Sequence, residues 1–246
     1  MALLLLAAFV ARQATAAKPL LPLRLFSSRN VTGANIIQFL MVAGLFGMFF
    51  SGVLFMQRVL GYDAVETGFA FLPVSLGIGI LSLGFSANLT LRFGTRPVLL
   101  VGLVLLVPAL ALLARAPVDA SYWVDVLPSM VLIGVGAGVV FPALTTLAMS
   151  SATPADAGLS SGLLNTTLQV GGAVGLSVLA TLATSRTDTL LADGESSAAA
   201  LTGGYHLAFG VAAGILVAAI VVAIAVLQPP EKQEAVAAEP AYSEAV

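Results

Sequence analysis

The chain has 246 residues, of which 59% are hydrophobic and only 9% charged, and its mean hydropathy is +1.05. Soluble domains carry about 25% charged residues to cover their surface, so this composition excludes a soluble globular fold and favours an exterior in contact with hydrocarbon. The net charge of −2 argues against a nucleic-acid partner, the absence of cysteine excludes disulfides, and one histidine leaves almost nothing for metal or haem ligation.

The segment 1–32 opens with an apolar run, Met1–Val10, that is too short to span a bilayer. It could be the apolar region of a signal peptide or the last turns of a helix. No positive charge precedes the run, which counts against a signal peptide. We therefore expect the end of a truncated helix, followed by a basic cytoplasmic segment.

Six apolar stretches follow within residues 33–227. A hydrocarbon core of about 30 Å takes roughly 20 residues to cross as a helix. We expect membrane spans over Gly33–Gln57, Glu66–Asn88, Pro97–Ala114, Trp123–Leu147, Pro154–Ala183 and Tyr205–Leu227. The tail 228–246 is polar and is expected to be disordered. The sequence thus predicts an all-α membrane protein with one six-helix bundle.

Lysine and arginine lie mostly on one side of these spans. Seven of the ten precede the first span, separate the second from the third, or follow the sixth. The other three, Arg58, Arg115 and Arg186, lie with most of the carboxylates on the opposite side. The positive-inside rule therefore puts the N-terminal segment and the C-terminus in the cytoplasm of a cell-membrane protein, with Tyr122 and Trp123 at the outer headgroup level.

Hydrogen-bonding side chains are distributed unequally among the spans. The third and sixth have almost none, whereas the other four carry amides or hydroxyls. Because unpaired polar groups cost several kcal/mol in lipid, those four should wall a cavity and the other two should face lipid. The second and fifth spans also open alike, as Val-Glu-Thr-Gly at 65–68 and Ala-Asp-Ala-Gly at 155–158. Both patterns favour two inverted three-helix repeats, an architecture of transporters.

Four amides are the candidates for a substrate pathway. Asn35 and Gln38 share a face of the first span, and Asn165 and Gln169, four residues apart, share a face of the fifth. We expect them to line a central cavity, where they contact substrate, water or each other. The alternative is interhelical hydrogen bonding alone, which stabilises by about 0.6–2 kcal/mol per contact.

Small residues recur at helix-packing spacing in the fourth and fifth spans. They permit close approach of neighbouring helices, and with proline they also permit bending or sliding. Ordinary packing is the alternative explanation. The residues concerned are Gly134, Gly138, Pro142, Gly171, Gly172 and Gly175.

The loop between the second and third spans reads Arg92-Phe-Gly94-Thr-Arg96. Two arginines beside a glycine make a compact basic turn that can dock onto the carbonyl-rich C-terminus of a helix and lock one conformation. The alternative is anchoring by positive charge alone.

This R-F-G-x-R motif resembles the cytoplasmic-loop signature of the major facilitator superfamily. Residues 19–26 (PLLPLRLF), the stretch 59–73 and the stretch 162–172 are similar to its fourteen-helix drug:proton antiporter branch. The signature usually has an acidic residue before its first arginine, where this chain has Leu91, and the position before Gln169 is often basic, where this chain has Leu168.

The resemblance implies one half of a major facilitator fold, matching the C-terminal part of such a transporter. It implies secondary-active efflux of small amphipathic molecules by proton antiport when the protein is complete. It implies no cofactor other than a proton gradient. The implied partners are the lipid bilayer, the substrate, and a second helical bundle that is either an N-terminal half or a second copy.

Two other features bear on function. No acidic or basic side chain lies deep within the six spans, although proton coupling normally needs a titratable group there. A non-transporting membrane subunit that packs against a partner bundle is therefore the alternative function. Ser160 in a G-x-S-x-G pattern and His206 could make an intramembrane protease, but they belong to opposite ends of their spans, so we expect no enzyme.

Overall fold

The computed structural model describes residue 12 and the ranges 28–150 and 157–227. Within these ranges six helices are long and apolar enough to cross a membrane, and the described residues contain no strand. The predicted all-α, six-span architecture is confirmed. The expected end of a truncated helix and the tail 228–246 lie outside the described residues.

The spans are longer or more segmented than the apolar windows. The first is α2 (Arg29–Arg58). The second comprises α3 (Ala64–Ala70), α4 (Leu72–Ile80), the π-helical turn η2 (Leu81–Phe85) and α5 (Ser86–Phe93). The third is α6 (Thr95–Leu113), and the fourth begins as the π-helical turn η3 (Tyr122–Val126) and continues as α7 (Leu127–Met149). The last two are α8 (Ala157–Ala192) and α9 (Ser197–Val226). Helices continue past the hydrocarbon into polar surroundings, which is why apolarity alone underestimates their length.

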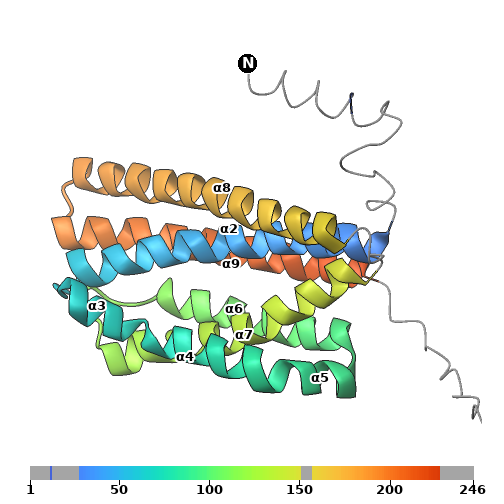
Figure 1. Ribbon diagram of the computed structural model, residues 1–246. Helices are drawn as coiled ribbons and strands as arrows, with labels where there is room; N and C mark the ends of the chain where they lie inside the picture. Colours follow the sequence, from blue (N-terminus) through green and yellow to red (C-terminus); the bar gives the residue numbers. More distant parts are fainter. Residues whose placement is uncertain (1–11, 13–27, 151–156, 228–246) are drawn as a thin grey trace, which may run out of the picture.

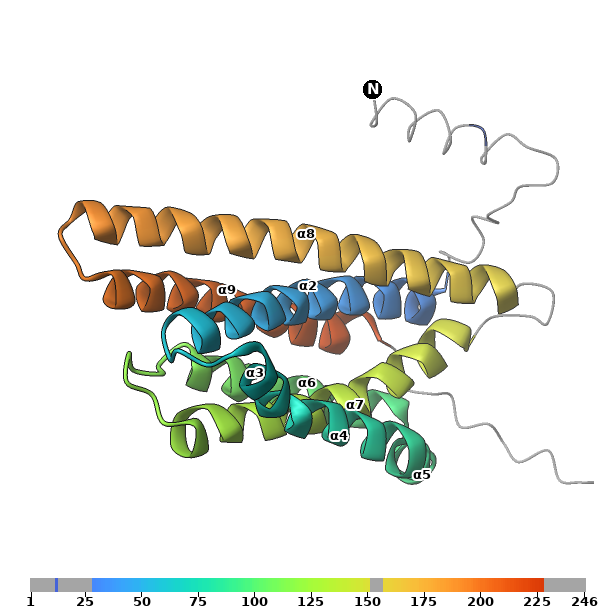
Figure 2. The same cartoon turned by 60° about the vertical axis from the view of Figure 1, so that its left-hand side comes forward.

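The six spans form two layers of three. One layer contains α2, α8 and α9, and the other contains the α3–α5 span, α6 and α7 (Figures 1 and 2). Each layer mixes the two halves of the sequence: the first span packs against the fifth and sixth, and the fourth packs against the second and third. This exchange is the contact pattern of two inverted three-helix repeats, so that prediction is confirmed.

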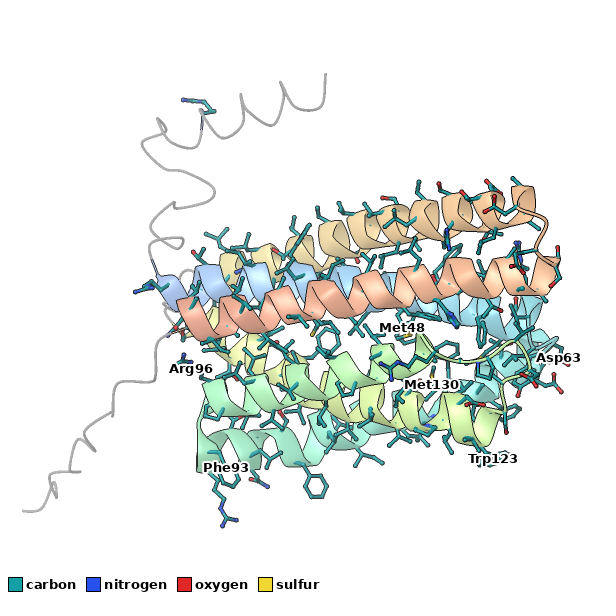
Figure 3. All side chains as sticks on the ribbon, turned by 180° about the vertical axis from the view of Figure 1, so that it is seen from behind. Met48, Asp63, Phe93, Arg96, Trp123 and Met130 are labelled. Atoms are coloured by element: carbon teal, nitrogen blue, oxygen red, sulfur yellow. The ribbon has the colours of Figure 1, made fainter. Side chains whose placement is uncertain are left out.

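The core lies where the two central helices, α2 and α7, face their neighbours. Met48 of α2 and Met130 of α7 are fully buried close to the junction of the layers (Figure 3). The helices α6 and α9 bury one side, which on α6 includes Leu99, Leu103 and Leu106. Their other sides expose apolar side chains such as Val101 on α6 and Val221 on α9, as lipid-facing helices do.

Glycines make the closest helix contacts in both layers. A Cβ on Gly138 of α7 would lie 2.8 Å from the carbonyl oxygen of Gly77 on α4. A Cβ on Gly175 of α8 would overlap the backbone of Ala43 on α2, and one on Gly171 would lie 2.9 Å from the carbonyl oxygen of Phe39. Real Cβ atoms do not approach backbone so closely, so these pairs of helices meet at this distance only because glycine lacks the atom.

Proline in α7 is compensated from the neighbouring span. Pro142 has no N–H, so the carbonyl of Gly138, four residues earlier, has no intrahelical donor. The hydroxyl of Ser82, in η2, donates a hydrogen bond to that carbonyl at 3.2 Å. The π-helical turn thus carries a donor that satisfies the carbonyl freed by proline, as a helix within a membrane requires.

Candidate functional site

The amides of the first span are buried and hydrogen-bonded at the contact between α2 and α8. The Gln38 side chain donates to the carbonyl of Leu164 on α8 at 2.7 Å. Thr167 of α8 donates to the amide oxygen of Asn35 at 3.0 Å, and the amide nitrogen of Asn35 donates to the carbonyl of Val31 at 2.9 Å. Both amides therefore hold α2 against α8.

The amides of the fifth span lie on the other side of this contact. Asn165 and Gln169 are both exposed on α8. Asn165 and Gln38 line a cavity of about 180 Å³ together with Thr145 of α7 and Ser161. Gln169 does not line that cavity. Two of the four predicted residues thus line one cavity, Asn35 does not, and the pathway role of all four stays a prediction.

Hydroxyl side chains are weaker evidence for a cavity than amide side chains. Thr145 and Thr146 donate to the carbonyls of Phe141 and Pro142, four residues earlier in α7, at 3.0 Å each. Thr166 does the same to Gly162 in α8 at 2.9 Å. A hydroxyl that bonds back to its own helix needs no cavity. The prediction that four spans are cavity walls therefore depends mainly on the amides.

The basic loop joins the two layers at one end. Gly94 has φ +84°, a left-handed conformation that favours glycine, and turns the chain from α5 into α6. The guanidinium of Arg96 donates to the carbonyl of Ile224, in the last turn of α9, at 2.7 Å. Arg92 is exposed, with its guanidinium 5.3 Å from the ring centre of Phe93. The helix-terminal docking expected of this loop is therefore made by Arg96, and its conformational role stays a prediction.

Sequence reasoning missed a polar cleft at the opposite end, between α2 and α8. Arg58 and Asp188 both line it, with hydroxyl side chains of α8, and its volume is about 790 Å³. An adjoining cavity of about 180 Å³ includes Ser51, whose buried hydroxyl has no hydrogen-bond partner among the described residues. Arg58 and Asp188 looked like separate loop charges because the fifth span was expected to end at Ala183. Since α8 continues to Ala192, it carries Asp188 alongside α2.

The Ser–His pair is not assembled. Ser160 is buried near the start of α8, whereas His206 lies near the start of α9, which follows the far end of α8. The Nε2 atom of His206 is 2.8 Å from the carbonyl of Ala116, so the imidazole fastens α9 to the loop after α6. Proteolysis needs contact at about 3 Å between the two side chains, which this arrangement excludes.

Comparison with known proteins now decides the family. Residues 2–176 match the family model described as Major Facilitator Superfamily. The chain belongs to this superfamily. The family expected from the loop motif is thereby confirmed.

Curated relatives carry names of drug resistance and export. The chain is 38% identical to the puromycin resistance protein pur8 of Streptomyces alboniger, covering 89% of this chain and 45% of the relative. It is 36% identical to the cephamycin export protein CmcT of Amycolatopsis lactamdurans (92% and 44%) and 29% identical to the multidrug transporter protein MdtP of Bacillus subtilis strain 168 (78% and 35%). The chain spans less than half the length of each of these relatives.

Proposed function

We propose that this chain forms one six-helix half of a secondary-active exporter of small amphipathic molecules, driven by proton antiport when a second bundle completes it. The observation that carries the proposal is the exposed face of α8. In a superfamily member, Asn165 and Gln169 stand on the surface of a membrane span and Asn165 borders a cavity shared with Gln38. Amides are too costly to leave in lipid, so this face belongs against a second bundle or a water-filled pathway.

The membrane orientation is part of the proposal. Phe93 and Arg96 lie at one end of the bundle and Asp63 and Trp123 at the other (Figure 3). We place the Arg96 end in the cytoplasm of a cell-membrane protein, because cytoplasmic loops collect lysine and arginine. Cysteine introduced at Asp119, which is exposed, should react with a membrane-impermeant thiol reagent in intact cells, and cysteine introduced at Thr95 should not. Labelling at Thr95 from outside would overturn this orientation.

Proton coupling is expected to need groups that this chain does not supply. The carboxylates in its described spans are Glu66, Asp125 and Asp188, and each lies near a helix end on the Trp123 side. Proteoliposomes that contain the chain alone should therefore show no gradient-driven accumulation of a fluorescent amphipathic cation. Accumulation above that of empty liposomes would refute the need for a second bundle.

The direct test of the function is a chimera in which this chain replaces the matched region of the Streptomyces alboniger puromycin resistance protein. The chimera should protect a sensitive host against puromycin, and Gln169→Ala should reduce that protection while membrane abundance stays constant. The matched control is Gln57→Ala, in the last turn of α2 and outside the cavity that Asn165 borders. A chimera that reaches the membrane at the level of the intact relative but gives no protection would count against the proposed function.

A further inference from the structure

A second pocket lies at the Trp123 end, between the α3–α4 segment and the start of the fourth span. Its volume is about 580 Å³, close to that of a small drug-like molecule's site. Four aromatic side chains and one carboxylate line it, together with aliphatic residues of α4 and α7. They are Tyr62, Glu66, Phe69, Tyr122 and Trp123.

The aromatic walls are held by specific contacts. The hydroxyl of Tyr122 donates to the carbonyl of Ala70 at 3.0 Å, which joins η3 to the end of α3. The rings of Tyr122 and Trp123 meet edge to face with centres 5.5 Å apart. Phe69 and Trp123 are 66% and 73% exposed, so both rings still have free faces. Ring faces carry negative electrostatic potential and attract cations.

The carboxylate is fixed at the same pocket. Glu66 is the third residue of α3 and closes a capping box with Asp63, accepting a hydrogen bond from the Asp63 backbone N–H at 3.0 Å. That bond uses one carboxylate oxygen, and among the described residues no hydrogen bond is formed by the other. The capping box therefore orients a negative charge beside the aromatic rings.

The surrounding charge has the same sign. The segments 58–66 and 114–126, which flank the pocket, carry four carboxylates and two arginines. In Figure 3 Asp63 and Trp123 lie at the same end of the bundle. A net negative surface raises the local concentration of cations before they reach the pocket.

We propose that this pocket binds an organic ammonium ion that bears an apolar body. The rings would take the cationic head by cation–π contact, Glu66 would pair with its charge, and the aliphatic wall would cover the apolar part. This inference does not rest on the proposed transport, because it concerns equilibrium binding to a pocket formed by this chain alone. Anchoring of tyrosine and tryptophan at the headgroups explains the aromatics, and helix capping explains the orientation of Glu66, but neither explains why they line one pocket.

The test uses Trp123, the single tryptophan of the chain, as the reporter. The purified full chain in a non-ionic maltoside detergent is titrated with benzyltrimethylammonium while tryptophan emission is followed at selective excitation. Saturable quenching is expected. Glu66→Gln should weaken binding about tenfold, and it should still fold because glutamine keeps the capping acceptor. Phe69→Leu should weaken binding about threefold to tenfold.

Matched control variants distinguish binding at this pocket from nonspecific attraction by negative charge or by exposed apolar surface. Asp119→Asn removes a carboxylate from the same end outside the pocket, and Phe85→Leu removes an exposed ring from the same span. Both should bind like the unmodified chain. Equal weakening by Asp119→Asn and Glu66→Gln, or a non-saturable signal in every variant, would overturn the proposal.

The ammonium group could be supplied by a soluble cation or by a choline lipid headgroup. A short-chain phosphatidylcholine, added below its micellar concentration to the benzyltrimethylammonium complex, distinguishes these sources. Displacement assigns the site to the lipid headgroup, and unchanged quenching assigns it to a soluble cation. Failure of the chimera to export puromycin would leave this binding result intact, so the two proposals fail separately.

Discussion

The second and fifth spans occupy equivalent places, since each packs on the central helix of its layer, yet they are built differently. The fifth is the single 36-residue helix α8, whereas the second is divided among α3, α4, η2 and α5. Pro73, near the start of α4, cannot continue the hydrogen bonding of α3, and η2 serves the carbonyl freed by Pro142. The interruptions therefore have local chemical causes that do not disturb the repeat.

The exposed faces of the two spans differ as well. The second exposes large apolar side chains, including Leu76, Ile80 and Leu83. The fifth exposes amides and hydroxyls, including Gln169 and Thr181. The two-fold repeat thus preserves close glycine packing against the central helix and leaves the outward chemistry free to diverge. Substitutions of the glycines at the close helix contacts should therefore have similar effects in both layers, whereas substitutions on the outward faces of the two spans should not.

The largest expected effect on the unfolding free energy comes from the glycines at the close helix contacts. Gly175→Ala should destabilise the chain by about 2–3 kcal/mol, because its Cβ overlaps the Ala43 backbone and α8 must move off α2. Gly138→Ala should cost a similar amount in the other layer. The measurement is the unfolding free energy of the purified chain in detergent. Gly162→Ala, with open space around its Cβ, should instead stabilise by about 0.5–1 kcal/mol. A loss from Gly162→Ala equal to that from Gly175→Ala would contradict the assignment of the effect to the close helix contact.

The next effect concerns the hydrogen bond by which Arg96 joins the two layers. Arg96→Ala removes a charge-assisted hydrogen bond to the end of α9 and should cost about 1.5–3 kcal/mol. Arg92→Ala, in the same loop but exposed, should change stability by less than about 0.5 kcal/mol. Thermal unfolding midpoints of the two variants, compared at equal detergent, give the answer. Equal destabilisation would assign the loop's contribution to net positive charge rather than to docking.

A smaller effect is expected where the second span compensates proline. Ser82→Ala should cost about 1 kcal/mol because the Gly138 carbonyl loses its donor. In a Pro142→Ala background the same change should cost almost nothing, since the restored N–H at 142 serves that carbonyl. A double-mutant cycle of unfolding free energies measures the coupling. Additive effects would mean that the hydroxyl does not perform this role.

The last stability prediction separates the two pairs of amides. Gln38→Ala should cost about 0.6–2 kcal/mol because it breaks the bond between α2 and α8. Gln169→Ala should leave stability within about 0.5 kcal/mol, since its side chain is exposed, while lowering drug protection in the chimera. Unfolding and protection are measured on the same variants. A stability loss from Gln169→Ala as large as that from Gln38→Ala would favour interhelical bonding over a pathway role.

Much of the fold could be predicted because each signal is local. The apolar windows located all six spans. The functional side chains were harder. Asn35 and Gln38 looked equivalent to Asn165 and Gln169, because composition records that an amide is present but not what it meets. Only packing directs the first pair between helices and leaves the second pair exposed.

The sequence by itself determined the membrane environment, the number of spans, the inverted repeat and the superfamily, because hydrocarbon dictates apolarity, length and charge bias along the chain. The tertiary structure alone decided which helices share a layer and that Ser82 serves the carbonyl freed by Pro142. It also decided that Arg58 and Asp188 line one cleft and that Glu66 and four aromatic rings line another. Most of these arrangements bring together residues distant in sequence. They depend on how close two helices approach and at which register, and that is set by the summed packing of the whole bundle rather than by any local pattern.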